Sequence, residues 1–324
     1  MANYRVGDII RLTRIASGLT QEQLSENICS VETMSRIENG KHGVKKDIYQ
    51  KLMEKMNRNP ERSYAICVDK DMQIIEERAA FEEAMTRHDF ERADEYMTLL
   101  KEKAGESILT KNYVRRESAF LDFYQNRITS AELVEILEEL AEETVPDYRR
   151  YMEEKIIFPF TEQEIILFKR LAVAYGRNGA NELAIEICEM LLRSLRSEYM
   201  VEWKENEITV LGNMAFFYSR LNRYDFAYKL VCEVCNKAKM YDNGVLLEES
   251  IFNKSWCTVR EIKECKNKEG EIEDCKKLIK KAYYLSLARN DQTNVKIFSD
   301  YYAAQFIMRH SLVSRSEKHC KVRL

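Results

Sequence analysis

The residues of this 324-residue chain whose types and spacing could do chemistry lie between residues 30 and 41. If Met34 and Ile37 are buried, the 3.6-residue period of an α-helix turns five neighbours outward. These neighbours carry a guanidinium, a carboxylate, an amide, a hydroxyl and an aliphatic group, which can hydrogen-bond or contact base edges in a DNA groove. We therefore expect a DNA-facing surface formed by Val31, Glu32, Ser35, Arg36 and Asn39.

Two short helices with defined ends are needed to present that surface. Thr20 and Gln23 form a Thr-x-x-Gln capping box, which predicts a helix that starts at Gln21. A second helix can start after Ser30 and end at Gly40, because glycine suits the left-handed C′ position. This segment therefore has the pattern of a helix-turn-helix.

Apolar residues recur every three or four positions through and beyond this segment, as packed helix faces require. The set comprises Val6, Ile9, Ile10, Thr13, Leu24, Ile28, Met34, Ile37, Ile48, Leu52 and Met56. It predicts a compact domain of four or five helices over residues 1–65, a size at which a domain can fold alone. Pro60 interrupts the preceding helix and marks the boundary near residue 65.

The caps, the corner and the Ser-Arg-Ile-Glu-Asn-Gly ending resemble the Cro and lambda-repressor (XRE) helix-turn-helix family over roughly Val6 to Met56. That family tends to bury an ion pair between its first helix and its recognition helix, so the resemblance implies that Arg14 and Glu38 touch. One departure is Thr13, where many members carry an aliphatic residue. Ile9 would then carry more of the packing.

The DNA contacts follow from the same resemblance. Gln21 would hold a phosphate at a helix N-terminus, and base edges would be approached by Val31, Glu32 and Arg36. Ser30 and Lys41 complete the predicted DNA-binding set. The implied partner is double-stranded DNA with a near-palindromic operator, bound by a homodimer.

The charge distribution supports this assignment. Residues 1–66 hold 11 Lys and Arg against 8 Asp and Glu, a net charge of +3, whereas the whole chain carries −3. A basic module favours contact with phosphates, and an acidic remainder discourages nucleic acid from lying along it. Because the basic excess is small, one module alone should have low affinity for DNA. We therefore expect two modules to act together in a dimer.

The composition is that of a helical globular protein. Only 3 Pro and 10 Gly occur, so helices are favoured almost everywhere and the predicted fold class is all-α. No uncharged apolar stretch is long enough to cross a membrane, and the N-terminus lacks the apolar core of a signal peptide. We therefore expect a cytoplasmic protein.

The cysteines and histidines do not suggest a reactive or metal site. Nine scattered Cys lack the spacing of a disulfide framework. Cys232 and Cys235 form a Cys-x-x-Cys pair, but no second pair accompanies it and it falls in the helical run Tyr224 to Lys239. Without a nucleophile elbow, a phosphate loop or a convergent acid and base, we predict no enzyme, no cofactor and no metal.

Residues 66–324 show weakly repeated helix corners, as in stacked helical hairpins. Tyr175 to Cys188 matches Tyr218 to Cys232, with alanine recurring where paired helices approach closely. This pattern resembles degenerate tetratricopeptide repeats and predicts about five hairpins and a final helix, with an ordinary helical bundle as the alternative. The small residues expected at the close-packing position are Ala93, Ala131, Ala184, Ala227 and Cys275.

A Cro-type N-terminus joined to such repeats resembles the peptide-pheromone-responsive regulators of Gram-positive bacteria, the Rgg, PlcR and NprR types. In that family asparagines on inner helices hold the peptide backbone, which implies a short peptide ligand held by Asn206, Asn213 and Asn253. Asn213 is the strongest candidate because it lies among apolar residues in mid-helix, where an unpartnered amide is costly. Its alternative role is a bond to a neighbouring helix backbone.

Charged and aromatic residues extend this interpretation. Lys169 and Arg170 could meet a peptide carboxylate, or form a solvated edge. The aromatic stretch from Tyr283 to Met308 could close the superhelix or join two subunits. The alternative function is a repeat scaffold that captures a protein such as a response regulator, with constitutive DNA binding.

Overall fold

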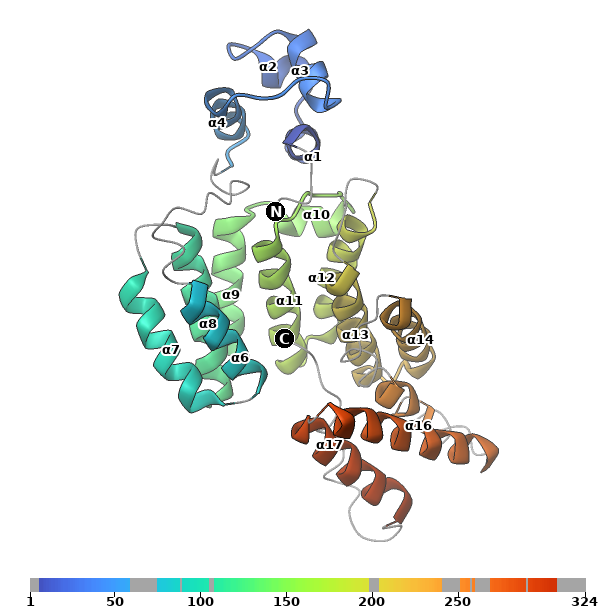
Figure 1. Ribbon diagram of the computed structural model, residues 1–324. Coiled ribbons are helices and arrows are strands. Elements are labelled where there is room, and N and C mark those ends of the chain that lie inside the picture. Colours follow the sequence, from blue (N-terminus) through green and yellow to red (C-terminus); the bar gives the residue numbers. More distant parts are fainter. Residues whose placement is uncertain are drawn as a thin grey trace. The chain divides into compact units, whose positions relative to one another are not determined.

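The structure is a computed structural model that describes residues 6–58, 75–87, 89–104, 108–197, 204–240, 251–256, 258–259, 269–289 and 291–307. All regular secondary structure in these ranges is helical, which confirms the all-α prediction (Figure 1). The predicted boundary at residue 65 lies outside the described residues. The chain divides into two compact units, one formed by Met1–Ala174 and Glu189–Trp203, the other by Tyr175–Cys188 and Lys204–Leu324.

The N-terminal part of the first unit contains the predicted short helices. They are α1 (Val6–Ala16), α2 (Gln21–Ser25), α3 (Val31–Glu38) and α4 (Lys46–Lys55). The Thr20 hydroxyl accepts a bond from the Gln23 N–H, and the Gln23 side chain accepts one from the Thr20 N–H, which confirms the capping box. The Ser30 hydroxyl likewise accepts from the Thr33 N–H and confirms the second N-cap.

The end of α3 and the corner before it both use left-handed backbone. Gly40 has φ 68°, and its N–H donates to the Ile37 carbonyl, while the Lys41 N–H donates to the Arg36 carbonyl. These two bonds are the Schellman pattern that the predicted C′ glycine requires. Asn27 has φ 62° in the α2–α3 corner, a conformation that asparagine tolerates better than most residues.

The helices enclose one apolar core. It is formed by Ile9, Ile10, Leu12, Leu24, Met34, Ile37, Tyr49, Leu52, Met53 and Met56. The prediction was wrong for Val6, which is 39% exposed at the first turn of α1, where the helix has not yet reached its neighbours. Close packing instead involves Gly7, because a Cβ there would lie 2.1 Å from the Ile37 carbonyl oxygen.

Arg58, just after α4, fixes the end of this domain within the first unit. Its side chain is only 3% exposed, and its Nη2 donates to the Tyr151 hydroxyl and, at 3.0 Å, to Asp147 Oδ2. The Arg150 guanidinium donates to the carbonyl of Ala16 at the end of α1. The end of α1 and the residue just after α4 are therefore both tied to the segment around α10.

The remaining helices follow one another with short corners. They are α6 (Ile75–Thr86), α7 (Phe90–Lys103), α8 (Ile108–Tyr124), α9 (Ser130–Thr144), α10 (Tyr148–Glu153), α11 (Glu162–Arg177), α12 (Asn181–Leu195), α13 (Lys204–Arg220), α14 (Tyr224–Met240), α16 (Glu269–Ala288), α17 (Gln292–Tyr302) and a π-helical turn, Ala303–Ile307. Consecutive helices pack against each other in pairs, as the hairpin prediction requires. These pairs are α6 and α7, α8 and α9, α13 and α14, and α16 and α17.

The small-residue prediction holds for three alanines. Ala93, Ala184 and Ala227 are each the fourth residue of their helix and are fully buried. The prediction was wrong for Ala131, which is exposed in the first turn of α9. The fourth residue of that helix is Leu133, which is fully buried, so this hairpin packs around a larger side chain.

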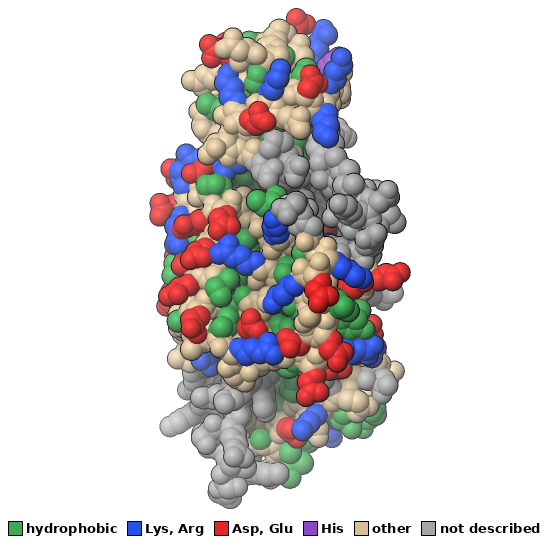
Figure 2. Space-filling model, turned by 90° about the vertical axis from the view of Figure 1, so that its left-hand side faces the viewer, with side chains coloured by type: hydrophobic (Ala, Val, Ile, Leu, Met, Phe, Trp, Pro, Cys, Tyr) green, Lys and Arg blue, Asp and Glu red, His purple; other side chains and the backbone are tan. Residues whose placement is uncertain are grey.

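Surface charges on the repeats are largely satisfied within the chain. Acidic and basic side chains lie close together over the face drawn in Figure 2. Arg127, which donates to Asp94, holds the pKa of that carboxyl below its ordinary value. Two further arginines each pair with two carboxylates, Arg115 with Glu139 and Glu143, and Arg149 with Glu138 and Glu142.

Thr13 provides a test of the packing in the N-terminal core. Its side chain is fully buried, and its Oγ1 has no hydrogen-bond partner. We predict that Thr13→Val stabilises the domain by about 1 kcal/mol, because the substitution removes an unpaired hydroxyl and keeps the shape. Hydrogen exchange of α1 and α3 amides in the full chain should slow about fivefold.

Thr20→Val is the control for this measurement. It removes a hydroxyl that caps α2, and exchange should therefore become faster by a similar factor. Unchanged or faster exchange in Thr13→Val would contradict the interpretation of Thr13.

Candidate nucleic-acid interface and peptide-binding residues

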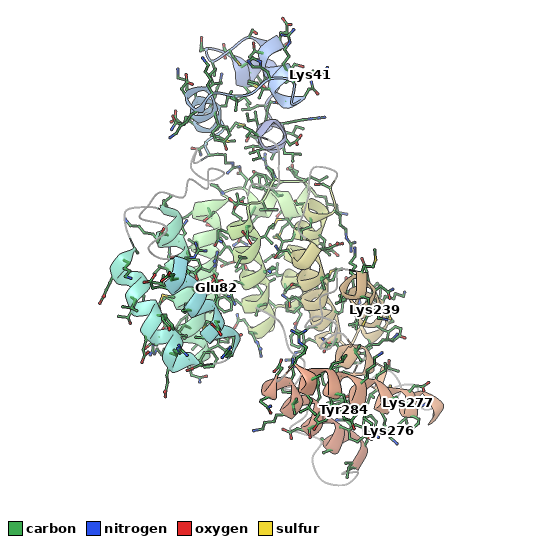
Figure 3. The ribbon with its side chains drawn as sticks, viewed as in Figure 1. Lys41, Glu82, Lys239, Lys276, Lys277 and Tyr284 are labelled. Carbon is green, nitrogen blue, oxygen red and sulfur yellow. The ribbon has the colours of Figure 1, made fainter. Side chains whose placement is uncertain are left out.

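The outer face of α3 carries the predicted base-contacting side chains. Met34 is fully buried and Ile37 is 2% exposed, so the opposite side of the helix faces away from the core. The side chains of Arg36 and Glu32 are 63% and 77% exposed, and Val31 is exposed as well. Ser35 is half-buried, while Asn39 and Lys41 are exposed beyond it, Lys41 at the outer edge of the domain (Figure 3).

Local bonds hold several of these side chains in position. Arg36 Nη2 lies 3.0 Å from Glu32 Oε1, an exposed pair of adjacent turns that contributes less than about 1 kcal/mol and can be exchanged for DNA contacts. Asn39 Nδ2 donates to the Ser35 carbonyl at 2.7 Å. The Ser30 hydroxyl is engaged in its cap, so its local role in the free chain is to start α3.

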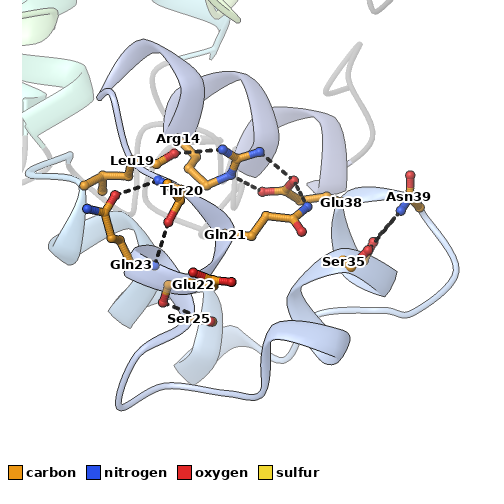
Figure 4. A network of polar contacts seen from close by, with 10 residues as sticks. All are labelled: Arg14, Leu19, Thr20, Gln21, Glu22, Gln23, Ser25, Ser35, Glu38 and Asn39. Atoms are coloured by element: carbon orange, nitrogen blue, oxygen red, sulfur yellow. Dashed lines mark hydrogen bonds and ion pairs between the residues drawn. The ribbon is translucent and has the colours of Figure 1, made fainter.

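A buried carboxylate joins the three helices behind this face (Figure 4). Arg14 Nε donates to Glu38 Oε1 at 2.6 Å and Arg14 Nη2 donates to Glu38 Oε2 at 2.9 Å, which confirms the predicted contact. Arg14 Nη1 donates to the Leu19 carbonyl at 2.8 Å. The Glu38 side chain is 2% exposed, so this bidentate pair fixes α1 against the end of α3.

Gln21 belongs to the same network. Its Nε2 donates to Glu38 Oε2 at 2.6 Å. The amide is therefore engaged in orienting the buried carboxylate, and it can reach a phosphate only by giving up that bond. The family resemblance had implied that Gln21 contacts a phosphate. Nothing in the spacing of residues 21 and 38 indicated that Gln21 would bond to Glu38.

The loop after α3 adds basic groups that the sequence reasoning missed. His42, Lys45 and Lys46 are exposed, like Lys41. α4 begins at Lys46, and its N-cap Lys45 makes no side-chain capping bond, so first-turn N–H groups stay available there. The run of three lysines over residues 41–46 was the available signal for phosphate contact.

The predicted peptide-binding asparagines differ in their surroundings. Asn206 and Asn253 are half-buried and each interacts with neighbouring residues. Asn213 is only 1% exposed, and its Nδ2 has no hydrogen-bond partner. Its amide nitrogen therefore makes no bond to a neighbouring helix backbone, and a ligand could reach it only by displacing the side chains that cover it.

The two predicted basic residues on α11 also differ. Lys169 is half-buried and interacts within the chain. Arg170 is 11% exposed, and its Nη2 donates to Glu117 Oε2 at 2.9 Å. Burial alone would raise the pKa of Glu117, but the charges of Arg170 and Arg116 outweigh it and hold that pKa below its ordinary value.

The remaining candidate regions are an aromatic stretch and a cysteine pair. Tyr284 and Ile307 are exposed by 63% and 68%, and Met308 lies outside the described residues. Cys232 is half-buried and Cys235 is buried in α14, where burial raises the pKa of the Cys235 thiol to about 11. In the described part of the chain, no three Cys, His, Asp or Glu side chains are grouped to hold a metal.

Comparison with known proteins supports the helix-turn-helix assignment. Residues 10–62 match the helix-turn-helix family model. PlcR of Bacillus thuringiensis, solved with the peptide PapR7 and DNA, is 18% identical with a TM-score of 0.57, and the match covers 94% of this chain and 99% of that one. Apo ComR of Streptococcus vestibularis is 12% identical, with a TM-score of 0.50 and coverage of 94% and 99%. No curated protein matches the sequence.

The N-terminal segment is thus a helix-turn-helix domain of the XRE type. Over 94% of its length the chain shares the fold of PlcR and of ComR. None of the described helices is both long and apolar enough to span a bilayer.

The buried network predicts an unequal response to two arginine substitutions. Arg14→Ala leaves a carboxylate that is 2% exposed without its charged partner, which should destabilise the domain by about 3 to 5 kcal/mol. Arg36→Ala breaks only an exposed pair and should cost less than about 1 kcal/mol. Native-state hydrogen exchange of the α3 amides measures both, and equal losses would contradict the structural role of the network.

Proposed function

We propose that the chain is a transcriptional regulator that binds DNA sequence-specifically, and that its helical repeats bind a short signalling peptide and hold a homodimer. The single observation that carries the DNA-binding half is the outer face of α3. That face is polar and exposed, and it lies opposite the buried Met34 and Ile37. A helix of this kind fits the major groove of DNA.

Base readout and phosphate contact fall to different residues in this proposal. Arg36 would donate two hydrogen bonds to a guanine edge after leaving Glu32, and Val31 would contact a thymine methyl; both side chains are exposed. Lys41, Lys45 and Lys46 would contact phosphates beside the groove. Ser35 within α3, and Ser30 and Asn39 at its two ends, would flank these contacts.

Two copies are needed for useful affinity. The N-terminal module has a net charge of only +3, so one module neutralises few phosphates. A homodimer would place two α3 helices about one DNA turn apart on a near-palindromic operator. The exposed apolar side chains at Tyr284, Leu287 and Ile307 are the proposed subunit contact.

The peptide-binding half of the proposal rests on the repeats. PlcR, whose fold this chain shares, was solved with a peptide and DNA. Asn213 is the leading residue here because its buried Nδ2 lacks a partner, and an unsatisfied buried donor is costly until something accepts from it. Asn206, Asn253 and Lys169 are secondary candidates.

Arg36→Ala tests base readout. Selection of random-sequence duplexes by the immobilised full chain should show a preferred base at one position of each half-site, and the substitution should lose that preference at a cost of about 1 to 3 kcal/mol. Lys41→Ala is the comparison variant, which should weaken binding to all sequences about equally and flatten the salt dependence. Uniform weakening by Arg36→Ala would assign Arg36 to a phosphate instead.

Asn213→Ala tests the sensing role. Operator binding measured without added peptide should stay unchanged, whereas the response to a low-molecular-mass extract of the source cells should be lost. Ser219→Ala is the matched control on α13, because its buried hydroxyl is already satisfied by the Phe216 carbonyl at 2.6 Å. Loss of basal DNA binding in Asn213→Ala alone would show that Asn213 is structural.

A further inference from the structure

Two cysteines on α14 take no part in the proposed DNA and peptide contacts. Cys232 and Cys235 are three residues apart in this helix, and both are free thiols. Cys232 is half-buried, whereas Cys235 is 7% exposed and continues the buried stripe that contains Ala227 and Val231. A small molecule in solvent can therefore reach Cys232, and a second thiol lies one turn behind it.

A tyrosine and a lysine adjoin the more accessible thiol. Tyr228 lies one turn before Cys232 on the same side of α14, and its hydroxyl donates a hydrogen bond to the Cys232 sulfur. Lys254 belongs to the helical segment 251–256, and its Nζ lies 5.4 Å from the centroid of the Tyr228 ring. Lys254 also donates to the Tyr228 hydroxyl. A cation from a second helix therefore faces the cysteine pair.

The charge of this lysine acts on both thiols. Burial alone would lower the pKa of Lys254, but its interactions with Cys232 and Tyr228 outweigh burial and raise that pKa above its ordinary value. Burial raises the pKa of the Cys235 thiol to about 11, although Lys254 opposes the shift. A neighbouring ammonium favours the thiolate, which is the form that peroxides oxidise. Accessibility and charge together make Cys232 the thiol that is oxidised first.

The spacing of the pair permits a disulfide. In an α-helix the Cα atoms of residues i and i+3 lie about 5 Å apart, within the range of about 4.4 to 6.8 Å that disulfides span. The Cβ atoms lie about 5 to 6 Å apart, farther than the roughly 3.5 to 4.5 Å of an unstrained disulfide. The turn must tighten to close the bond, and a bond strained in this way is easily reduced again.

We propose that Cys232 and Cys235 form a redox-active dithiol that a hydroperoxide converts to a reversible disulfide, with Lys254 as the cation that favours the Cys232 thiolate. In the first step the Cys232 sulfur attacks a peroxide oxygen. An S–O bond forms, the O–O bond breaks, and the leaving hydroxide or alkoxide takes a proton from solvent. Cys232 is then a sulfenic acid, and the peroxide has been reduced by two electrons.

The second step closes the disulfide. Cys235 loses its proton to solvent and attacks the Cys232 sulfur, so the S–S bond forms, the S–O bond breaks and hydroxide leaves as water with a solvent proton. In sum, two thiols and one hydroperoxide give one disulfide, one water and one alcohol, or a second water when the oxidant is hydrogen peroxide. An external dithiol reverses the reaction by exchange.

A single tryptic peptide reports on the pair. Cleavage after Lys229 and Lys237 releases residues 230–237, which contain both cysteines and no third one. The full chain is treated with hydrogen peroxide, free thiols are blocked with iodoacetamide, and the peptide is weighed by mass spectrometry. We expect the peptide to lose the mass of two hydrogen atoms and to escape alkylation. Dithiothreitol added before iodoacetamide should restore both thiols.

Cys29 is the internal control in the same chain. It is half-buried like Cys232, but no other cysteine lies near it in the sequence, and burial raises the pKa of its thiol. Disulfide formation in peptide 230–237 should be about tenfold faster than oxidation of Cys29, because Cys29 has the smaller thiolate fraction. Equal rates would show general thiol oxidation and would overturn the proposal.

Two substitutions separate the roles of the pair and the lysine. In Cys235→Ala the second step is blocked, so Cys232 should accumulate as a sulfenic acid that dimedone traps. Lys254→Gln should slow disulfide formation about tenfold, as a rise of one unit in the pKa of Cys232 implies. Lys254→Arg keeps the charge and should retain the rate. Lys277→Gln is the matched control, because Lys277 is 70% exposed and pairs with Asp274 at 3.2 Å.

The remaining outcomes each decide one part of the proposal. If both cysteines of the native peptide 230–237 stay open to alkylation after peroxide treatment, the dithiol is not redox-active. A peptide that gains oxygen without losing two hydrogen atoms would show that Cys235 does not attack, which overturns the disulfide. An unchanged rate in Lys254→Gln, with folding checked by circular dichroism, would overturn the role of Lys254. The native chain alone decides the disulfide, whatever the variants do.

Discussion

The geometry of the DNA-facing surface depends on one buried carboxylate, that of Glu38. Arg14 binds both of its oxygens and Gln21 binds one of them, so the end of α3 is held against α1 and the start of α2. A buried charge is tolerated only when such bonds satisfy it. The exposed side chains of α3 can then exchange partners freely, because the helix that carries them is fixed from behind.

Local chemistry made most of this domain predictable. The Thr20 cap, the Ser30 cap and the Gly40 ending are rules about adjacent residues, and all three hold. The Arg14–Glu38 pair came from the family resemblance, since residues 24 positions apart leave no local signal. For the same reason the Gln21–Glu38 bond was missed, although Gln21 itself was singled out.

The repeats were less predictable, because their important contacts join helices far apart in the sequence. Arg170 was proposed to meet a carboxylate, and the structure supplies Glu117, which lies 53 residues earlier. No periodicity of α8 or α11 alone shows that these side chains meet. Similarly, the alanine pattern indicated hairpins, but it misplaced the packing residue of α9 because Leu133 replaces the small residue there.

Ligand binding can act on α3 only if it favours one arrangement of the chain over another. Moving an equilibrium almost completely from one state to the other requires about 5.5 kcal/mol of differential affinity. A hydrogen bond to a charged group contributes about 1.5 to 3 kcal/mol, so a single contact of this kind is not sufficient. A peptide must therefore add further contacts. Arg58 and Arg150, which join the segment around α10 to the residue after α4 and to the end of α1, connect the helix-turn-helix domain to the repeats.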